Sequence, residues 1–451
     1  MPARRSGPVH RKRRRDQAKR VEALRHRNSN PVRRAGSGWV AQRTIGVRPL
    51  DVWPAVPLRA FGLRTTSIKI PETFSLITHP NEAIATLETI RRAAGTPGIK
   101  SIELDYSGCT NLDLCASVVQ DVIALRGKRQ AAFRGSQVNF PGKFSKIDDV
   151  NLLLVTNGIL KQLNHPISKA LPPDLTSRLR FSNLKIGRPG PLYLSSEAEI
   201  AATELADFFD GVLRTEHYQL RPEWKANLIQ LTAEVLDNVE QHAQGERSWH
   251  TIGYYKQDTK PDCGGECHIV LFNFGETIYE SLNRPDTSGE LKRQIRELAS
   301  EHKNRALFTR LAENVGILTP LWEEESLWTL YALQEGVSRF MNKPEGIDRG
   351  NGSIKMLEFF AELVSSEPQM ALVSGKTHIL FDGRYRLSEV QIGTERRKII
   401  AFNEANDLHE RPDPRCVQTI RRHFPGTLVS LKFKIKSSDL AKVIGKLDAQ
   451  D

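Results

Sequence analysis

A carboxylate, an amide and an imidazole recur every four residues along one apolar segment of the chain. They belong to Glu234, Asn238 and His242, within the sequence LIQLTAEVLDNVEQHA. Residues four apart lie on the same face of a helix, so the three side chains are expected to lie together. Asn and Asp are unfavourable inside helices because their side chains compete for backbone groups, and the pair Asp237-Asn238 therefore needs an explanation. The pair belongs either to a chemical site or to a solvated helix face.

Two further segments place glycines where a ligand would approach the main chain. The apolar run 269–274 ends in Asn273-Phe274-Gly275 and then enters a new helix. A polar side chain at the end of a buried strand, with a glycine two residues later, suits a ligand that comes close to the backbone. Further along, Gly350-Asn351-Gly352 is a glycine-rich turn before a helix, where free N–H groups would bind phosphate. Taken alone, such a turn is also typical of an ordinary tight loop.

The order and combination of these segments resemble the ATP-binding domain of the GHKL superfamily. That superfamily includes gyrase, heat-shock-90 chaperones, histidine kinases and the anti-sigma-factor serine kinases. Its first motif is an acid, three residues and an asparagine on a helix, which Glu234 and Asn238 match. Its second motif is Asp-x-Gly-x-Gly after a strand, and the stretch from Asn273 to Thr277 matches it in part.

The later motifs of the superfamily also have counterparts in this chain. The glycine-rich turn corresponds to Gly350-Asn351-Gly352, and a final Gly-Thr that leads a strand corresponds to Gly426-Thr427. The resemblance covers about 195–436, a little over half of the chain. Among the members of the superfamily, the pattern of motifs most resembles that of the anti-sigma-factor serine kinases.

The resemblance implies a role for each matching residue and two cofactors, ATP and Mg²⁺. Asn238 would place its amide oxygen on Mg²⁺, while the triphosphate supplies other oxygen ligands. Glu234 would be the catalytic residue, a general base toward water or a hydroxyl group. The implied nucleotide-binding residues are Asn238, His242, Asn273, Gly275, Gly350, Gly352, Ser353 and Thr427.

The resemblance also implies a lid over the bound nucleotide and a residue that recognises its base. Residues 279–345 would form a helical lid over the nucleotide. Asn273 stands where the superfamily has an aspartate that reads the adenine amino group. The oxygen of an asparagine side chain can accept that hydrogen bond, but its NH₂ group could equally face another base.

The elements that must hold these residues are grouped as helices followed by strands. A capping-box pattern, Ser196-x-x-Glu199, opens one helix, and a second is expected over 223–242. Strands are expected over 250–255, 267–273, 369–373, 378–381, 398–402 and 427–435. This order predicts an α+β arrangement over 195–451, with helices over a mixed sheet.

An earlier region, 67–167, alternates strands with helices and predicts a separate α/β domain. Short strands are expected at 75–78 and 130–133, among others. The run from Ile102 to Asp113 resembles the strand, turn and helix start of STAS domains, the fold of anti-sigma-factor antagonists. In those antagonists a phosphorylated serine follows the aspartate, whereas Leu114 follows Asp113 here. The resemblance therefore implies a docking or sensing domain that carries no phosphate.

The net charge of the chain is concentrated at its start. Residues 1–34 hold thirteen of the 65 Lys and Arg residues and two of the 53 Asp and Glu residues. Thirteen minus two leaves +11, which is nearly the whole net charge of +12. The rest of the chain is therefore close to neutral, and its bulk charge does not indicate a nucleic-acid-binding surface. The tail itself, 1–36, has too few large apolar groups to fold. It would bind nucleic acid or an acidic membrane, or remain a solvated arm.

The remaining predictions concern linkers and compartment. A proline-containing linker is expected over 37–66 and another over 168–194. Five cysteines in 451 residues do not suggest a disulfide framework, which favours a cytoplasmic protein. No apolar run reaches the roughly 18 residues of a membrane-spanning helix.

Together these features predict a cytoplasmic Mg-ATP-binding regulatory protein. It would hydrolyse ATP slowly or transfer phosphate to a Ser or Thr of a protein partner, and a homodimer is compatible with the sequence. One alternative is an ATP-gated clamp that holds nucleic acid through 1–34. A second alternative is a nucleotide-sensing scaffold without catalysis, as the altered second motif would suggest.

Overall fold

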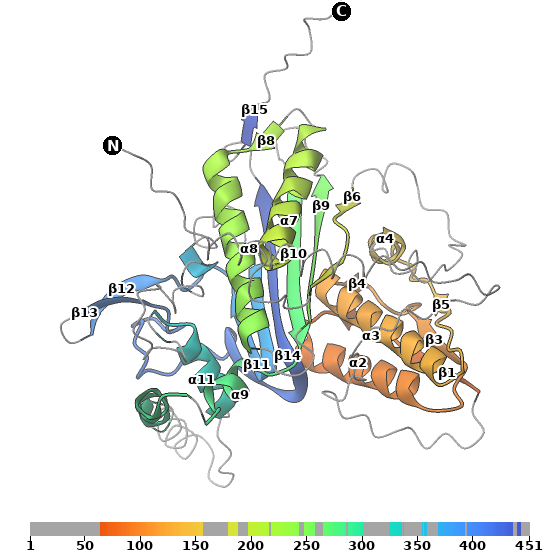
Figure 1. Cartoon of the computed structure of the whole chain (residues 1–451), viewed down its shortest axis with the longest axis horizontal. Coiled ribbons are helices and arrows are strands. Elements are labelled where there is room, and N and C mark those ends of the chain that lie inside the picture. Colours follow the sequence, from red (N-terminus) through yellow and green to blue (C-terminus); the bar gives the residue numbers. More distant parts are fainter. Residues whose placement is uncertain are drawn as a thin grey trace, which may run out of the picture. The chain divides into compact units, whose positions relative to one another are not determined.

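The fold belongs to the mixed α/β class that the sequence predicts. The computed structural model describes residues 64–156, 179–187, 197–215, 218–242, 248–257, 265–285, 287–298, 300, 324–335, 337, 354, 356–358, 369–392, 395–435 and 440–442, with main chain alone at 237–242, 392, 395, 435 and 440–442. The basic tail, residues 37–63 of the first linker and the glycine-rich turn at 350–352 lie outside these ranges. Helices and strands keep the labels of Figure 1.

The first part of the described chain is a small parallel sheet with helices between its strands. The strands are β1 (Thr65–Lys69), β3 (Ser101–Asp105) and β5 (Gly142–Lys143), in the order β1-β3-β5, and β2 (Thr73–Phe74) pairs with β4 (Asn111–Leu112). The helices are α2 (Pro80–Gly95), α3 (Leu114–Phe133) and α4 (Asp148–Thr156). Strands that run parallel need such helical crossovers, which agrees with the α/β pattern expected here.

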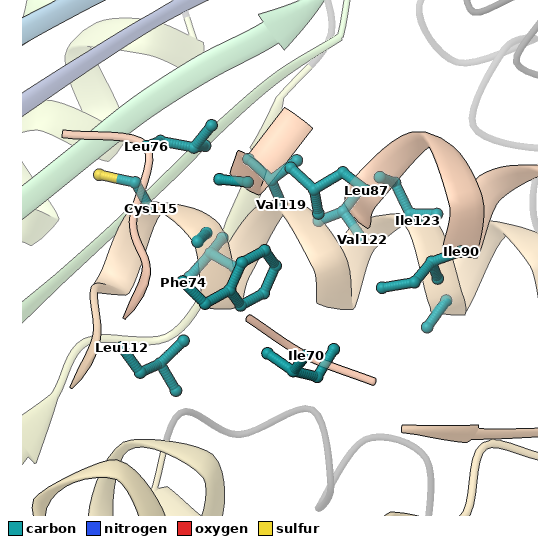
Figure 2. Packing of buried hydrophobic residues seen from close by; sticks show 14 of the residues in the cluster. Ile70, Phe74, Leu76, Leu87, Ile90, Leu112, Cys115, Val119, Val122 and Ile123 are labelled. Atoms are coloured by element: carbon teal, nitrogen blue, oxygen red, sulfur yellow. The ribbon is translucent and has the colours of Figure 1, made fainter. Parts of the chain in front are cut away.

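The helices α2 and α3 pack against each other through apolar side chains. Figure 2 shows Leu87 and Ile90 of α2 beside Val122 and Ile123 of α3, and all four are buried. The two helices form what is called here the α2–α3 layer. Burying such side chains removes apolar surface from water and stabilises the layer.

Two short strands expected in this region are not strands. Residues 75–78 form a turn, because the Ser75 hydroxyl accepts hydrogen bonds from Ile77 N at 3.2 Å and Thr78 N at 3.0 Å. Residues 130–133 are the last turn of α3. Gln130, Ala131 and Ala132 are good helix formers, and this propensity favours the continuation of α3 to Phe133.

The turn and the start of α3 are joined by one partly buried carboxylate. Asp113 Oδ1 accepts from Ala116 N at 2.6 Å, and Oδ2 accepts from Ser75 Oγ at 2.6 Å and Ile77 N at 3.2 Å. Burial raises the pKa of Asp113, and these donors oppose that rise. The residue thus caps the helix and fixes the preceding turn.

Replacing this cap is expected to destabilise the protein markedly. Asp113→Ala leaves the buried Ser75 hydroxyl and the Ala116 N–H without their acceptor and removes one of the two acceptors of the Ile77 N–H, so the free energy of unfolding should fall by about 3 kcal/mol. Asp113→Asn keeps one acceptor oxygen and should lose less. Urea denaturation of the two variants and the parent measures this. An alanine variant as stable as the parent would show that Asp113 does not hold the turn.

A six-stranded sheet forms the main body of the described chain. Its order is β11-β14-β10-β9-β6, and β7 also pairs with β9. The strands are β6 (Leu179–Phe181), β7 (Lys185–Gly187), β9 (Trp249–Gln257), β10 (Gly265–Phe274), β11 (Gln369–Phe381) and β14 (Val417–Ile435). Every pairing described in this sheet is antiparallel, whereas the sequence predicted a mixed sheet. The parallel pairs belong to the small sheet instead.

Helices and short strands surround the six-stranded sheet. Figure 1 shows α7 and α8 side by side along the long strands. The helices are α7 (Glu197–Arg214), α8 (Pro222–His242), α9 (Ile278–Leu282) and α11 (Glu324–Ala332), and the remaining strands are β8 (Tyr218–Leu220), β12 (Ser388–Ile392), β13 (Glu395–Ile399) and β15 (Leu440–Lys442). Part of the expected linker 168–194 belongs to the sheet, because β6 and β7 occupy its proline-free stretches.

The central strand β10 is apolar on both faces. Ile269 and Leu271 pack with α7 and α8, whereas Val270 and Phe272 pack in the same cluster as the α2–α3 layer. Adjacent residues of a strand point to opposite faces, so both faces of this sheet are buried. The regions expected as two domains, 67–167 and 195–451, therefore share one hydrophobic cluster.

Buried polar contacts also join α3 to the sheet. Cys115 Sγ lies 3.7 Å from His268 Nε2, which lies 2.8 Å from Ser430 Oγ. Arg126 Nη2 lies 3.4 Å from His250 Nε2, and its guanidinium lies 5.0 Å from the centre of the Phe274 ring. Polar contacts of this kind fix the register between apolar surfaces because a shifted arrangement would leave them unpaired.

Three histidines on this face are buried in their neutral form. His250, His268 and His378 expose 0%, 2% and 2% of their surface. Burial lowers the pKa of His250 to about 3, with help from the charge of Arg126, and that of His268 to about 3, with help from Lys432. Burial lowers the pKa of His378 to about 4, and the nearby Ile77 main chain opposes part of this shift.

None of the helices within the described ranges combines the length and the apolar character needed to cross a bilayer.

Candidate functional site

Helix α8 carries the first of the expected site residues beside the sheet. Leu228, Leu231 and Val235 are buried in the cluster that contains β10, and this apolar stripe holds the helix on the sheet. Glu234, next to Val235, is partly exposed at the edge of the buried stripe. A carboxylate there is held by a rigid element yet remains open to a ligand.

The main chain remains helical through Asn238 and His242, the other two residues of the four-residue spacing. Residue 238 lies one turn after Glu234, and His242 is the last residue of α8. Their side chains fall outside the described part of the chain. The helix predicted over 223–242 is confirmed to within one residue.

Asn273 lies one residue before the end of β10, on the face that meets α7 and α8. Its surface is 2% exposed, and its Oδ1 accepts a hydrogen bond from Thr427 N at 2.8 Å. Thr427 is also its partner in the strand register between β10 and β14. The sequence predicted both residues as parts of one site, and the structure brings them into direct contact.

A row of polar residues crosses three strands at this level, and it is called here the polar row. Asn273 of β10, Thr427 of β14 and Ser374 of β11 are register partners in turn. Thr427 Oγ1 lies 2.9 Å from Ser374 Oγ, and Ser374 Oγ also accepts from Ile278 N at 3.0 Å. Buried hydroxyl and amide groups cost free energy unless they are bonded, so the polar row must be held in one arrangement.

The neighbouring levels of the same face are apolar. On the same face, the next set of register partners is Leu271 of β10, Val429 of β14 and Leu372 of β11, each two residues from the polar row along its strand. All three are buried. The change from apolar to polar side chains therefore occurs near the end of β10 and in the middle of β11 and β14. A few polar groups beside a mostly apolar surface are typical of ligand sites.

Close packing explains the glycine that precedes Thr427. Gly426 has a φ of 141°, and a Cβ there would overlap with the main-chain oxygen of Asn273. The N–H of Gly275 bonds to the carbonyl of Pro425 at 3.1 Å, which joins the same two strands. The Gly426-Thr427 pair is thus needed for the approach of β14 to Asn273.

The described parts of the expected lid, 279–345, are anchored to the sheet. Thr277 caps α9 in a capping box with Glu280. Glu325 of α11 accepts from Lys376 N at 2.7 Å, at a bulge of β11 where Gly375 has a φ of 58°. The first turns of α9 and α11 are therefore fixed relative to the polar row.

Three expected site residues, Gly350, Gly352 and Ser353, lie outside the described ranges. The residues just after them, Ile354, Met356 and Leu357, are buried in the same cluster as Leu231 and Leu271. The chain that follows the glycine-rich turn therefore packs beside α8 and β10.

The sequence analysis missed Ser374 and Glu325. Ser374 follows the apolar run 370–373 and precedes Gly375, which repeats the pattern of a polar residue after an apolar run and close to a glycine, although β11 continues beyond it to Phe381. That signal was present in the sequence. Glu325 had no such signal, because its partner is a main-chain N–H that only the bulge at Gly375 exposes.

Comparison of the chain with protein-family models, with curated proteins and with solved structures gives no match. Within the described ranges, no group of three or more His, Cys, Asp or Glu side chains is arranged to hold a metal ion. The assignment of a function therefore depends on the chemistry of the polar row and of α8.

Proposed function

We propose that this chain is a regulatory protein that binds a purine nucleoside triphosphate with Mg²⁺ between α8 and the polar row. ATP is the nucleotide that the GHKL resemblance implies. The observation that carries the proposal is the contact between Asn273 and Thr427, which come from two separate sequence motifs. Helix α8, with Glu234 at the edge of its buried stripe, packs on the same face of the sheet.

The residues would divide the work of binding and chemistry between them. The polar row would bind the base, and the amide oxygen of Asn238 would be one Mg²⁺ ligand, with phosphate oxygens as others. His242, Gly275, Gly350, Gly352 and Ser353 would complete the nucleotide-binding set. A bound triphosphate would supply a phosphoryl group for transfer to an oxygen nucleophile.

Glu234 would accept the proton that leaves the nucleophile. The nucleophile would be water, which gives hydrolysis, or a Ser or Thr hydroxyl of a protein partner, which gives a kinase. A carboxylate fixed on a helix and partly open to solvent suits this role. Because Glu234 is retained, we propose catalysis rather than nucleotide sensing alone.

Substitutions on α8 test this division of roles. Asn238→Ala should weaken Mg²⁺-dependent nucleotide binding about tenfold or more, since it removes a metal ligand. Glu234→Gln should leave the dissociation constant within about twofold and lower turnover about 100-fold or more, since it removes the base. Calorimetry and phosphate release measure the two quantities.

The exposed Gln230 of the same helix provides the matched control. Gln230→Ala should change neither binding nor turnover. If Glu234→Gln turns over nucleotide like the parent and Asn238→Ala binds it like the parent, α8 does not contribute to a nucleotide site.

A further inference from the structure

The hydrogen bond between Thr427 and Asn273 fixes which way the Asn273 amide points. The donor is a main-chain N–H, and only the oxygen of the amide can accept from it, at 2.8 Å. Turning the amide over would place its NH₂ group against the Thr427 N–H, two donors facing each other. The orientation is therefore set by chemistry.

The surrounding contacts hold this arrangement in place. Gly426 lets β14 approach the main chain of Asn273, and Thr427 is tied through its hydroxyl to Ser374. Asn273 itself is 2% exposed, so its side chain has little room to adopt another rotamer. The oxygen already accepts from Thr427 N, whereas no described residue accepts from the NH₂ group, so the NH₂ group is the end of the amide that still needs a partner.

We infer that the polar row reads a purine with an oxygen at position 6, guanine or hypoxanthine, in preference to adenine. This inference rests on the proposed function. Guanine presents an acceptor at position 6, whereas adenine presents an amino donor there. A donor on Asn273 pairs with the first and opposes the second.

The expected discrimination is about 10- to 100-fold in dissociation constant, as for other matched and mismatched hydrogen bonds to bases. An aspartate at 273 would behave differently. One of its oxygens would still accept from Thr427 N, and the other would accept from the adenine amino group. The Asn273→Asp substitution should therefore reverse the preference.

The test is a titration of the full-length chain and of Asn273→Asp with the Mg²⁺ complexes of GTP, ITP and ATP. The parent should bind GTP and ITP about 10- to 100-fold more tightly than ATP, and the variant should prefer ATP. ITP lacks the 2-amino group of GTP, so a shared preference for both identifies the oxygen at position 6. Asn139→Asp, which adds the same charge at an exposed position of the first region, should retain the parental order.

Each outcome separates this inference from the proposed function. A parent that binds ATP as tightly as GTP and ITP, or more tightly, contradicts the reading by Asn273 and leaves the nucleotide site standing. If the parent protein binds none of GTP, ITP and ATP, both the base preference and the proposed nucleotide site are wrong. The comparison of GTP, ITP and ATP on the parent protein uses no variant. It therefore tests the inference even if Asn273→Asp does not fold.

Discussion

Acidification from pH 7 to pH 5 is expected to lower the free energy of unfolding by about 2 kcal/mol for each of three histidines buried in the sheet. His250, His268 and His378 have a folded-state pKa of about 3, 3 and 4. An unfolded histidine has a pKa near 6.5, so the unfolded chain binds the proton first. Their neutral forms support the fold fully above about pH 6.5, and this support is lost as the pH falls toward the folded pKa values.

Two partly buried carboxyl groups in the α2–α3 layer act in the opposite direction. Burial raises the pKa of Asp113 and raises that of Asp121 well above its ordinary value, so acidification relieves a cost at these positions. The total pH dependence is therefore a mixture. A comparison of variants isolates the histidine contribution, because the carboxyl groups are common to all of them.

The informative variant is His378→Leu, which removes one titrating ring from the buried face. Urea denaturation at pH 7 and pH 5 should show that this variant loses about 2 kcal/mol less than the parent over the interval. His79→Gln, at an exposed position, should lose as much as the parent. Equal losses in the parent and in His378→Leu would mean that His378 is not buried in its neutral form.

Gly426→Ala should produce the largest structural loss at the candidate site. The new Cβ would overlap with the main-chain oxygen of Asn273, and a φ of 141° is strained for any L-residue with a side chain. The free energy of unfolding should fall by about 3 kcal/mol, and nucleotide binding should weaken more than tenfold because the Thr427–Asn273 contact is displaced.

Gly211 is the matched control for this substitution. It lies in helix α7, and a Cβ there meets no other atom within 4 Å. Gly211→Ala should stabilise the protein by up to about 1 kcal/mol, because alanine is the better helix former. Denaturation midpoints of the two variants should thus move in opposite directions. A Gly426→Ala protein as stable as the parent would refute the close approach of β14 to β10.

Two of the elements that carry the candidate site, α8 and β10, were predicted correctly from the sequence. Helix α8 and strand β10 were confirmed because each is long and strongly patterned, and such segments are set by local periodicity. The resemblance implied that Asn273 and Thr427 belong to one nucleotide-binding set, but it did not predict their direct contact across 154 residues of sequence. Ser374 was missed although it has the same local signal.

Other features depend on contacts that no local pattern encodes. Strand β14 continues past Pro425-Gly426, where its pairing with β10 ends at Gly426 and its register with β11 shifts. The strands β6 and β7 form in a proline-rich stretch because β9 offers them an edge. The burial of both faces of β10 was visible as a continuous apolar run, but the run could not identify α2 and α3 as the second cover.

The most direct test of the central claim is a calorimetric titration of the full-length chain with purine nucleoside triphosphates, in the presence of Mg²⁺ and again with the metal chelated. The account predicts one binding site per chain, dependent on Mg²⁺ and weakened by Asn238→Ala. Absence of binding heat with GTP, ITP and ATP at millimolar concentration, together with unchanged thermal stability in their presence, would contradict it.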